Sequence, residues 1–348
     1  MPSLRSRIVR RGLVVAVTAL RSTGTGAPDP DGSEEDLEAY ALRLRTQMEE
    51  LATKLPPMRG AHALASTDAP VRSLWVASER VVADLAARER MEPDLLVDPE
   101  LGLADVLTRA DRVTLHLHGG GYCMGSPETH RGLASALSRT SRGPVLMPDY
   151  RLAPEHKYPA ALDDAMETYR WLVEERDVSP QRIAITGDSA GGGLAASLIV
   201  RLRDDELPGP ACYAGMSPWT DLAATGGSMQ ELASVDPWLT AALVKPAGRG
   251  YAGTVPLEHP YVSPLYADLH GLPPVLVHVG SDEILLDDAR RFVAKAREHG
   301  VDASLGRFEG LWHVFHAFPG LPESRDALRE IGAFIRRHTA EVPVRRSA

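Results

Sequence analysis

From about residue 71, short apolar segments rich in β-forming residues alternate with stretches of helical periodicity. Parallel strands need crossover connections, which helices supply, so this alternation predicts an α/β fold: a mostly parallel sheet with helices on both faces. Ligands bind such sheets outside the carboxyl ends of the strands, where we therefore expect the functional residues. The expected strands are 71–76, 113–118, 144–148, 182–186, 211–216, 275–279 and 303–307.

The composition is that of an ordinary globular protein. Of the 348 residues, 44% are hydrophobic and 24% are charged, and the formal net charge is -9. A nucleic-acid partner needs a basic face, so none is expected. Cys123 and Cys212 lie far apart and lack metal-ligand spacing, which indicates two unpaired thiols rather than a disulfide framework or a zinc site.

The N-terminal segment allows two interpretations. Arg5, Arg7, Arg10 and Arg11 precede the apolar stretch 12–20, as in an export signal. The apolar residues also recur at helical spacing, with the arginines largely on the other side, which favours an amphipathic helix packed on the protein itself. No apolar run approaches the roughly 18 residues needed to span a bilayer. We expect a cytoplasmic protein without an integral membrane segment, with secretion as the alternative.

A glycine-flanked serine lies between an expected strand and an expected helix, in the run Gly187-Asp188-Ser189-Ala190-Gly191. This setting is typical of the nucleophile elbow of α/β-hydrolases, where small neighbours allow a close backbone approach. Ser189 is therefore the expected nucleophile of a serine hydrolase. The Ala190 N–H, at the start of the helix, would point into the oxyanion hole.

A second glycine-rich turn, His118-Gly119-Gly120-Gly121, ends the expected strand 113–118. A backbone without side chains can turn its N–H groups toward a substrate oxygen, so this turn predicts the second half of the oxyanion hole. His116 and His118 share one face of the strand, but no further ligand accompanies them, and no metal is expected. We interpret His118 as a hydrogen-bonding brace for the turn.

The serine needs a histidine base and an acid that orients it, and in this fold the acid precedes the histidine. Asp282 follows the expected strand 275–279 and is the expected acid. The alternatives are Asp287 and Asp288, a turn or more into the next helix, and Glu283, which we expect to point elsewhere.

The expected base is His313, in the loop after the last expected strand. His316 would lie about one helical turn deeper and is the alternative. Other histidines, among them His130 and His278, lack a strand-end position late in the chain, so solvated or capping roles are expected for them.

Together these motifs resemble those of the bacterial hormone-sensitive-lipase-like esterases, known for a G-D-x-G signature. The resemblance covers roughly residues 70–335 and follows the family order: His118 to Gly121, Asp149 to His156 (Asp-Tyr-Arg-Leu-Ala-Pro-Glu-His), Gly187 to Gly192, Ser217 to Asp221 (Ser-Pro-Trp-Thr-Asp), Asp282, and His313 to Phe315. It implies a triad of Ser189, Asp282 and His313. It also implies that Gly120, Gly121 and Ala190 supply the oxyanion-hole N–H groups.

The family further implies a helical cap over the site. The cap would comprise an N-terminal segment, 1–65, and an insertion, 218–260, while 66–217 and 261–348 form the two parts of the α/β-hydrolase core. Trp219, Trp238 and Tyr251 are expected at the cap pocket. A cap helix also explains the N-terminal segment better than export does, and no cofactor is expected.

The expected reaction is hydrolysis of a carboxylic ester with a small, short-to-medium acyl group, through an acyl-enzyme on Ser189. The stretch 282–288 departs from the frequent Asp-Pro-Leu form of the acid motif and resembles the branch of monoterpene ε-lactone hydrolases and actinobacterial acetyl-hydrolases. A lactone or an N- or O-acetylated metabolite is therefore the alternative substrate. A ligand-binding module without catalysis is disfavoured because His313 is present. A small molecule is the expected partner, and a homodimer is left open.

Overall fold

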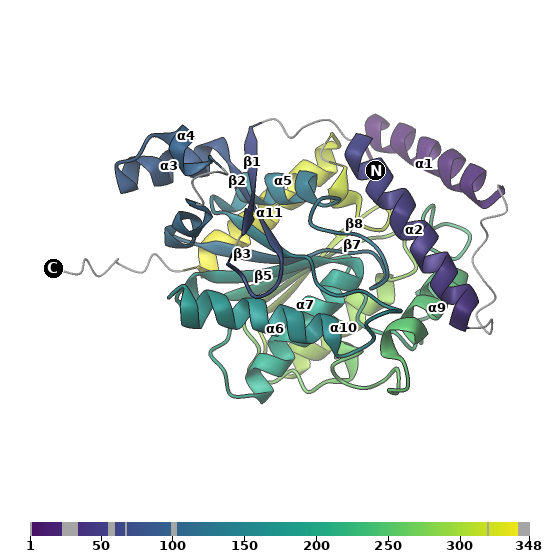
Figure 1. The fold of residues 1–348 in the computed structure, drawn as a ribbon. Coiled ribbons are helices and arrows are strands. Elements are labelled where there is room, and N and C mark those ends of the chain that lie inside the picture. Colours follow the sequence, from purple (N-terminus) through teal and green to yellow (C-terminus); the bar gives the residue numbers. More distant parts are fainter. Residues whose placement is uncertain are drawn as a thin grey trace.

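The structure is a computed structural model that describes residues 2–22, 34–54, 60–66, 68–98, 103–318 and 320–339. At its centre lies an eight-stranded sheet with the order β1-β2-β4-β3-β5-β6-β7-β8 (Figure 1). Strand β2 runs antiparallel to β1 and β4, and the remaining neighbours are parallel. The strands are β1 (Ala61–Ser66), β2 (Ser73–Ser78), β3 (Val113–Leu117), β4 (Val145–Pro148), β5 (Ile183–Asp188), β6 (Cys212–Met216), β7 (Val275–Gly280) and β8 (Ala303–Phe308).

The mostly parallel sheet confirms the expected α/β fold, and every expected strand is present with small shifts at its ends. Strand β1 is an addition that the sequence did not indicate. Its residues, Ala-His-Ala-Leu-Ala-Ser, have little intrinsic β preference, and the strand exists because it pairs along its whole length with β2. The sheet therefore begins inside the segment 1–65 that was predicted to belong to the cap.

Helices cover both faces of the sheet (Figure 1). On one face α5 (Arg131–Ser141) and α11 (Pro322–His338) bury a core cluster with alternate residues of the strands. On the other, α6 (Ala160–Arg170), α7 (Ser189–Asp204) and α10 (Leu286–Glu298) share a larger cluster. Further helices are α3 (Glu79–Glu89), α4 (Pro93–Leu96), α8 (Ser228–Glu231) and α9 (Ala241–Ala252), with short helical turns at Leu103–Arg109, Trp171–Glu175, Pro180–Arg182, Pro264–Tyr266 and Phe315–Ala317.

Two N-terminal helices, α1 (Leu4–Ser22) and α2 (Glu34–Lys54), lie on the same side of the molecule as α9 (Figure 1). The expected packing of the first helix is found in part: Val9 and Leu13 pack on a buried cluster around Trp312, and Arg7 and Arg11 are exposed. Leu4 and Ile8 are 65% and 61% exposed, however, and Arg10 turns inward to Asp282. No helix in the described ranges has the length and apolar character needed to cross a membrane.

Candidate active site

Five neighbouring strands deliver the residues of one site at one edge of the sheet. His118 follows β3, Ser189 follows β5, Ser217 follows β6, Glu283 lies just past β7, and His313 lies in the loop after β8. These strands are adjacent in the order β3-β5-β6-β7-β8, and all run parallel. Their carboxyl ends therefore bring together side chains that are far apart in the sequence.

Ser189 is the first residue of α7 and has a left-handed backbone with φ 53°. This strained conformation is tolerated because the neighbours are small. A Cβ on Gly187 would lie 2.2 Å from the Gly191 carbonyl oxygen, and a Cβ on Gly191 would lie 2.2 Å from those of Leu117 and His118. The elbow can therefore exist only with glycine at both positions, and it sits directly against the turn that follows β3.

The structure brings Ser189 and His313 together. Ser189 Oγ lies 2.8 Å from His313 Nε2, and the His313 side chain is buried. The alternative base, His316, is buried among Phe308, Phe315 and His278. Its burial lowers its pKa well below the usual value, so that ring is neutral and forms part of the core.

The acid that faces His313 is Glu283, so the prediction of Asp282 is corrected. Glu283 Oε1 lies 3.2 Å from His313 Nδ1, and Glu283 is fully buried. Asp282 turns outward, where its carboxylate pairs with Arg10 of α1 at 2.5 Å. Adjacent residues of a tight turn cannot both face the same histidine. The acid is one residue further from the strand than expected, and its side chain is one methylene longer.

The other acids proposed as alternatives have structural partners. Asp287 accepts a hydrogen bond from the Ser228 backbone N–H at 3.0 Å. Asp288 is buried and accepts the backbone N–H groups of Thr220 and Asp221 at 2.9 and 2.8 Å. Both residues tie α10 to the segment that follows β6.

Ser217 is a site residue that the sequence reasoning missed. Its hydroxyl donates to Glu283 Oε2 at 2.8 Å and accepts the Val314 N–H at 3.1 Å. The Gly280 N–H also donates to Glu283 Oε2, at 2.9 Å. One oxygen of Glu283 is thus fixed by two donors while the other faces His313. The available signal was the position of Ser217 at the end of β6, beside β7.

The electrostatics favour a basic imidazole at position 313. Burial alone would lower the pKa of His313, but the hydrogen bond and charge of Glu283, with the more distant charges of Asp236 and Asp188, raise it above its usual value. A carboxylate on one ring nitrogen and a serine hydroxyl on the other is the arrangement that lets an imidazole take a proton from the hydroxyl.

The turn after β3 is shaped by glycines. Gly120 and Gly121 have φ values of 127° and 61°, and a Cβ on Gly120 would lie 2.0 Å from the Met124 carbonyl oxygen. His118 Nδ1 lies 2.9 Å from the Gly119 carbonyl oxygen, in agreement with the expected bracing role. Burial lowers the pKa of His118 to about 3, so this ring is neutral and is not the base.

A buried carboxylate, Asp188, links this turn to the nucleophile elbow. It immediately precedes Ser189 and accepts the Gly119 N–H at 3.2 Å. His116 Nε2 and His130 Nε2 lie 3.3 and 3.5 Å from its two oxygens. Burial alone would raise the pKa of Asp188, but the charge of His130 and the hydrogen bonds of both histidines lower it far below the usual range. His130 does occupy the N-cap position of α5, but its ring is only 14% exposed and faces Asp188 instead of capping the helix.

The segment Asp149 to His156 forms hydrogen bonds to the glycine turn that follows β3. The Tyr150 hydroxyl donates to the His118 carbonyl oxygen at 2.5 Å, and the Ala153 N–H donates to the Tyr122 carbonyl oxygen at 2.8 Å. Arg45 of α2 adds hydrogen bonds to the carbonyl oxygens of Cys123 and Ala153, both at 3.1 Å. An N-terminal helix is thereby fastened to the loop that follows the glycines.

Two of the three aromatic residues expected at the cap pocket are buried. Trp219 and Tyr251 are buried, and Tyr251 stacks on Tyr122 with ring centroids 3.7 Å apart. Trp238 is 38% exposed and contacts Phe318 edge-on. Trp219 and Tyr251 therefore belong to the buried core, and Tyr251 contacts the residue that directly follows the glycine turn.

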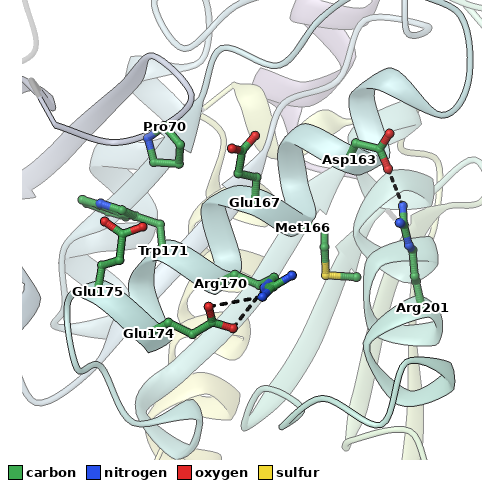
Figure 2. Close-up of a pocket in the computed structure, with 9 residues that line it drawn as sticks. All are labelled: Pro70, Asp163, Met166, Glu167, Arg170, Trp171, Glu174, Glu175 and Arg201. Atoms are coloured by element: carbon green, nitrogen blue, oxygen red, sulfur yellow. Dashed lines mark hydrogen bonds and ion pairs between the residues drawn. The ribbon is translucent and has the colours of Figure 1, made fainter.

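A hollow of about 410 Å³ lies away from these residues, along α6 (Figure 2). Its cations are paired, Arg170 with Glu174 and Arg201 with Asp163. None of the predicted site residues lines it, so we do not assign the reaction to it. Its lining residues are Pro70, Asp163, Met166, Glu167, Arg170, Trp171, Glu174, Glu175 and Arg201.

Within the described ranges, one group has ligand atoms spaced closely enough for a metal ion: Asp268, His270 and His299. Asp268 Oδ1 lies 2.6 Å from His270 Nδ1 and 2.9 Å from His299 Nδ1, so hydrogen bonds account for the grouping. The group is largely exposed, with Asp268 and His270 before β7 and His299 before β8, whereas Glu283 lies past the other end of β7. It has no part in the site.

Comparisons with known proteins identify the family of this chain. Residues 114–317 match the model of a family described as having the α/β-hydrolase fold. An acetyl-hydrolase of Streptomyces hygroscopicus is 44% identical over 66% of this chain and 77% of its own length. An ethyl acetate hydrolase of Pseudomonas putida is 32% identical over 84% of this chain and 94% of its own.

Solved structures extend the similarity to nearly the whole chain. An esterase from the bacterial hormone-sensitive lipase family is 34% identical, with a TM-score of 0.78, over 98% of this chain and all of its own. The fold, the serine–histidine–carboxylate contacts and these relatives lead to the same assignment. The chain belongs to the α/β-hydrolase family, within its hormone-sensitive-lipase-like group, and is a carboxylic ester hydrolase.

Proposed function

We propose that Ser189, His313 and Glu283 form the catalytic triad, and that the backbone N–H groups of Gly120, Gly121 and Ala190 form the oxyanion hole. The observation that carries this proposal is the pair of contacts on His313, 2.8 Å to Ser189 Oγ and 3.2 Å to Glu283 Oε1. The close approach of the glycine turn to the elbow supports the position of the hole.

In the first step, His313 Nε2 takes the hydroxyl proton as Ser189 Oγ bonds to the ester carbonyl carbon. The carbonyl oxygen becomes an anion held by the backbone N–H groups, and Glu283 stabilises the imidazolium. The C–O bond to the alcohol then breaks, and His313 gives its proton to the leaving oxygen. Water attacks the resulting acyl-enzyme with the same histidine as base, which releases the acid and restores Ser189.

We propose a small acyl group, with acetate esters as the preferred substrates. Two relatives are named for acetyl or ethyl acetate hydrolysis. The cap also approaches the site closely, since a Cβ on Gly121 would lie 3.6 Å from the Ala247 Cβ of α9. Little room for a long acyl chain is expected beside that turn.

The test is a panel of p-nitrophenyl esters from acetyl to dodecanoyl, with a lactone and an N-acetyl amide, against the wild type and Ser189→Ala. We expect the acetyl ester to have the highest kcat/KM, and Ser189→Ala to lose turnover and fluorophosphonate labelling. Retained turnover in that variant would overturn the nucleophile. A higher kcat/KM on the lactone or amide would overturn the acetyl-ester preference while leaving the triad intact.

We also propose that the protein acts in the cytoplasm. The N-terminal helix is part of the folded domain: Ser6 Oγ donates to Glu323 of α11 at 2.7 Å, and Arg10 pairs with Asp282. Cleavage after an export signal would remove these contacts. Fractionation of the native host with an antibody to the protein would test this placement.

A further inference from the structure

The loop that carries Glu283 is bonded to the cap on both sides of that residue. It runs from Gly280, the end of β7, to Leu286, the start of α10. The residue before Glu283 and the residue after it each bond to a segment that the sequence assigned to the cap. These contacts explain what the outward carboxylate of Asp282 does.

Arg10 of α1 makes the first contact. Its Nη1 lies 2.5 Å from Asp282 Oδ2, and its Nη2 donates to the Val235 carbonyl oxygen at 2.9 Å. One guanidinium therefore joins three segments that are distant in sequence. The side chains of Arg10 and Asp282 are 29% and 20% exposed, so the pair is partly shielded from water.

Asp236 of the insertion makes the second contact. Its Oδ1 accepts the backbone N–H groups of Trp238 and Leu239 at 2.8 and 2.9 Å. Its Oδ2 accepts the Ile284 N–H at 2.9 Å. Asp236 is buried, so one carboxylate both shapes the insertion and fixes the residue that follows Glu283.

The core contributes contacts of its own to this loop. The Ser281 and Asp282 N–H groups donate to the carbonyl oxygens of Phe308 and Leu311, both at 2.9 Å. These bonds hold the first half of the loop against the end of β8. The Ile284 N–H donates instead to Asp236 of the cap. The direction of the backbone at Glu283 therefore depends on contacts with both the core and the cap.

We propose that Arg10 and Asp236 are positioning residues: they hold the Asp282–Ile284 turn and, together with the Ser217 and Gly280 donors, set how Glu283 meets His313. This proposal rests on the proposed triad. Glu283 tolerates little movement, because its contact with His313 is already 3.2 Å long. Loss of either cap contact should therefore weaken orientation of the base, which lowers kcat, and leave substrate affinity nearly unchanged.

Arg10 is the better residue to change, because α1 has a second attachment. Ser3 N–H, Ser3 Oγ and Ser6 Oγ all donate to Glu323 of α11, at 2.5, 3.1 and 2.7 Å. Val9 and Leu13 pack on the core as well. The helix should therefore stay docked when the arginine side chain is shortened, and Arg11, exposed on the same helix, supplies a matched control.

The experiment compares Arg10→Gln, Arg10→Lys, Asp282→Asn, the Arg10→Gln/Asp282→Asn double variant and Arg11→Gln on p-nitrophenyl acetate. Arg10→Gln and Asp282→Asn should each lower kcat about three- to tenfold, with KM within about twofold. The double variant should be no slower than the slower single one, because the two side chains act through one contact. Arg10→Lys should recover part of kcat, and Arg11→Gln should match the wild type.

Equal kcat in Arg10→Gln and Arg11→Gln would overturn the proposal, as would a change confined to KM or additive losses in the double variant. Asp236→Asn gives an independent arm: its amide cannot accept N–H groups at both ends, so kcat should fall while the melting temperature shows whether the fold is retained. Failure of the triad itself would appear separately, as turnover retained by Ser189→Ala.

Discussion

Two neighbouring carboxylates, Asp282 and Glu283, are candidates for the triad acid. Comparing kcat of Glu283→Gln with kcat of Asp282→Asn shows which of them acts on His313. In the wild type, Glu283 Oε2 accepts hydrogen bonds from Ser217 Oγ and the Gly280 N–H, while Oε1 faces His313 Nδ1. A glutamine keeps its carbonyl oxygen at the end with two donors. Its NH₂ group then faces His313 Nδ1.

That NH₂ group donates, so it selects the tautomer in which the proton of His313 sits on Nε2. This nitrogen then cannot take the proton of Ser189 Oγ, 2.8 Å away. In a serine protease triad, the equivalent carboxylate-to-amide change costs about 10⁴ in kcat for the same reason. The contact here is longer, so we expect a loss of about 10³ to 10⁴, or about 4 to 5.5 kcal/mol of transition-state stabilisation.

Asp282→Asn removes the charge that pairs with Arg10, while its amide oxygen can still accept the Ser281 hydroxyl, so a loss of about three- to tenfold in kcat is expected. The assay is steady-state hydrolysis of p-nitrophenyl acetate, with circular dichroism to verify folding and a fluorophosphonate probe to compare Ser189 reactivity. The reasoning fails if Asp282→Asn loses more than about 10³ while Glu283→Gln stays within about tenfold of the wild type.

Two further predictions follow from the buried charges. Burial lowers the pKa of His313, but Glu283 raises it more, and catalysis needs the neutral ring. In a profile from about pH 5 to 9, kcat/KM of the wild type should therefore fall as the pH drops through this pKa. The residual activity of Glu283→Gln should show the same fall at a lower pH. A limb that does not move would contradict the assigned contact. Asp188→Asn should lower the free energy of unfolding by about 3 kcal/mol at neutral pH, measured with urea, because His116 and His130 lose their carboxylate. The pKa of Asp188 is lowered in the folded state, so its stabilisation is present above the unfolded value and the difference should shrink as the pH falls below about 4; Asp326→Asn, in an exposed pair, is the control.

The alternation of apolar strand segments with helical periodicity predicted the architecture, because both patterns are local properties of the sequence. The apolar runs predicted β2 to β8, and the residues at their ends included Ser189 and His313. The sequence did not predict strand β1, because most of its residues are small and weakly β-forming and its pairing with β2 is a tertiary contact. Local pattern cannot report a strand that only its neighbour stabilises.

Tertiary contacts also explain why the sequence predicted Asp282 and not Glu283 as the acid. Asp282 and Glu283 are both carboxylates past the same strand, and their sequence positions differ by one residue. Which of them faces inward depends on Arg10, Ser217 and Asp236, and these come from other parts of the chain. Contacts from distant segments fix which side chain of a turn faces inward. The position of the strand end therefore predicted the loop that holds the acid, but not which of the two carboxylates faces His313.

The attachment of α2 also bears on how such enzymes can be recombined. Arg45 reaches the carbonyl oxygens of Cys123 and Ala153 and forms a two-point contact with Glu155 at 2.7 and 2.9 Å. The carbonyl acceptors are backbone atoms that any relative with this loop geometry offers, whereas the carboxylate belongs to one side chain. A chimera that takes its N-terminal helices from a relative should therefore remain active when the graft brings an arginine at this position, and a graft without one leaves Glu155 and two carbonyl oxygens to be satisfied by water.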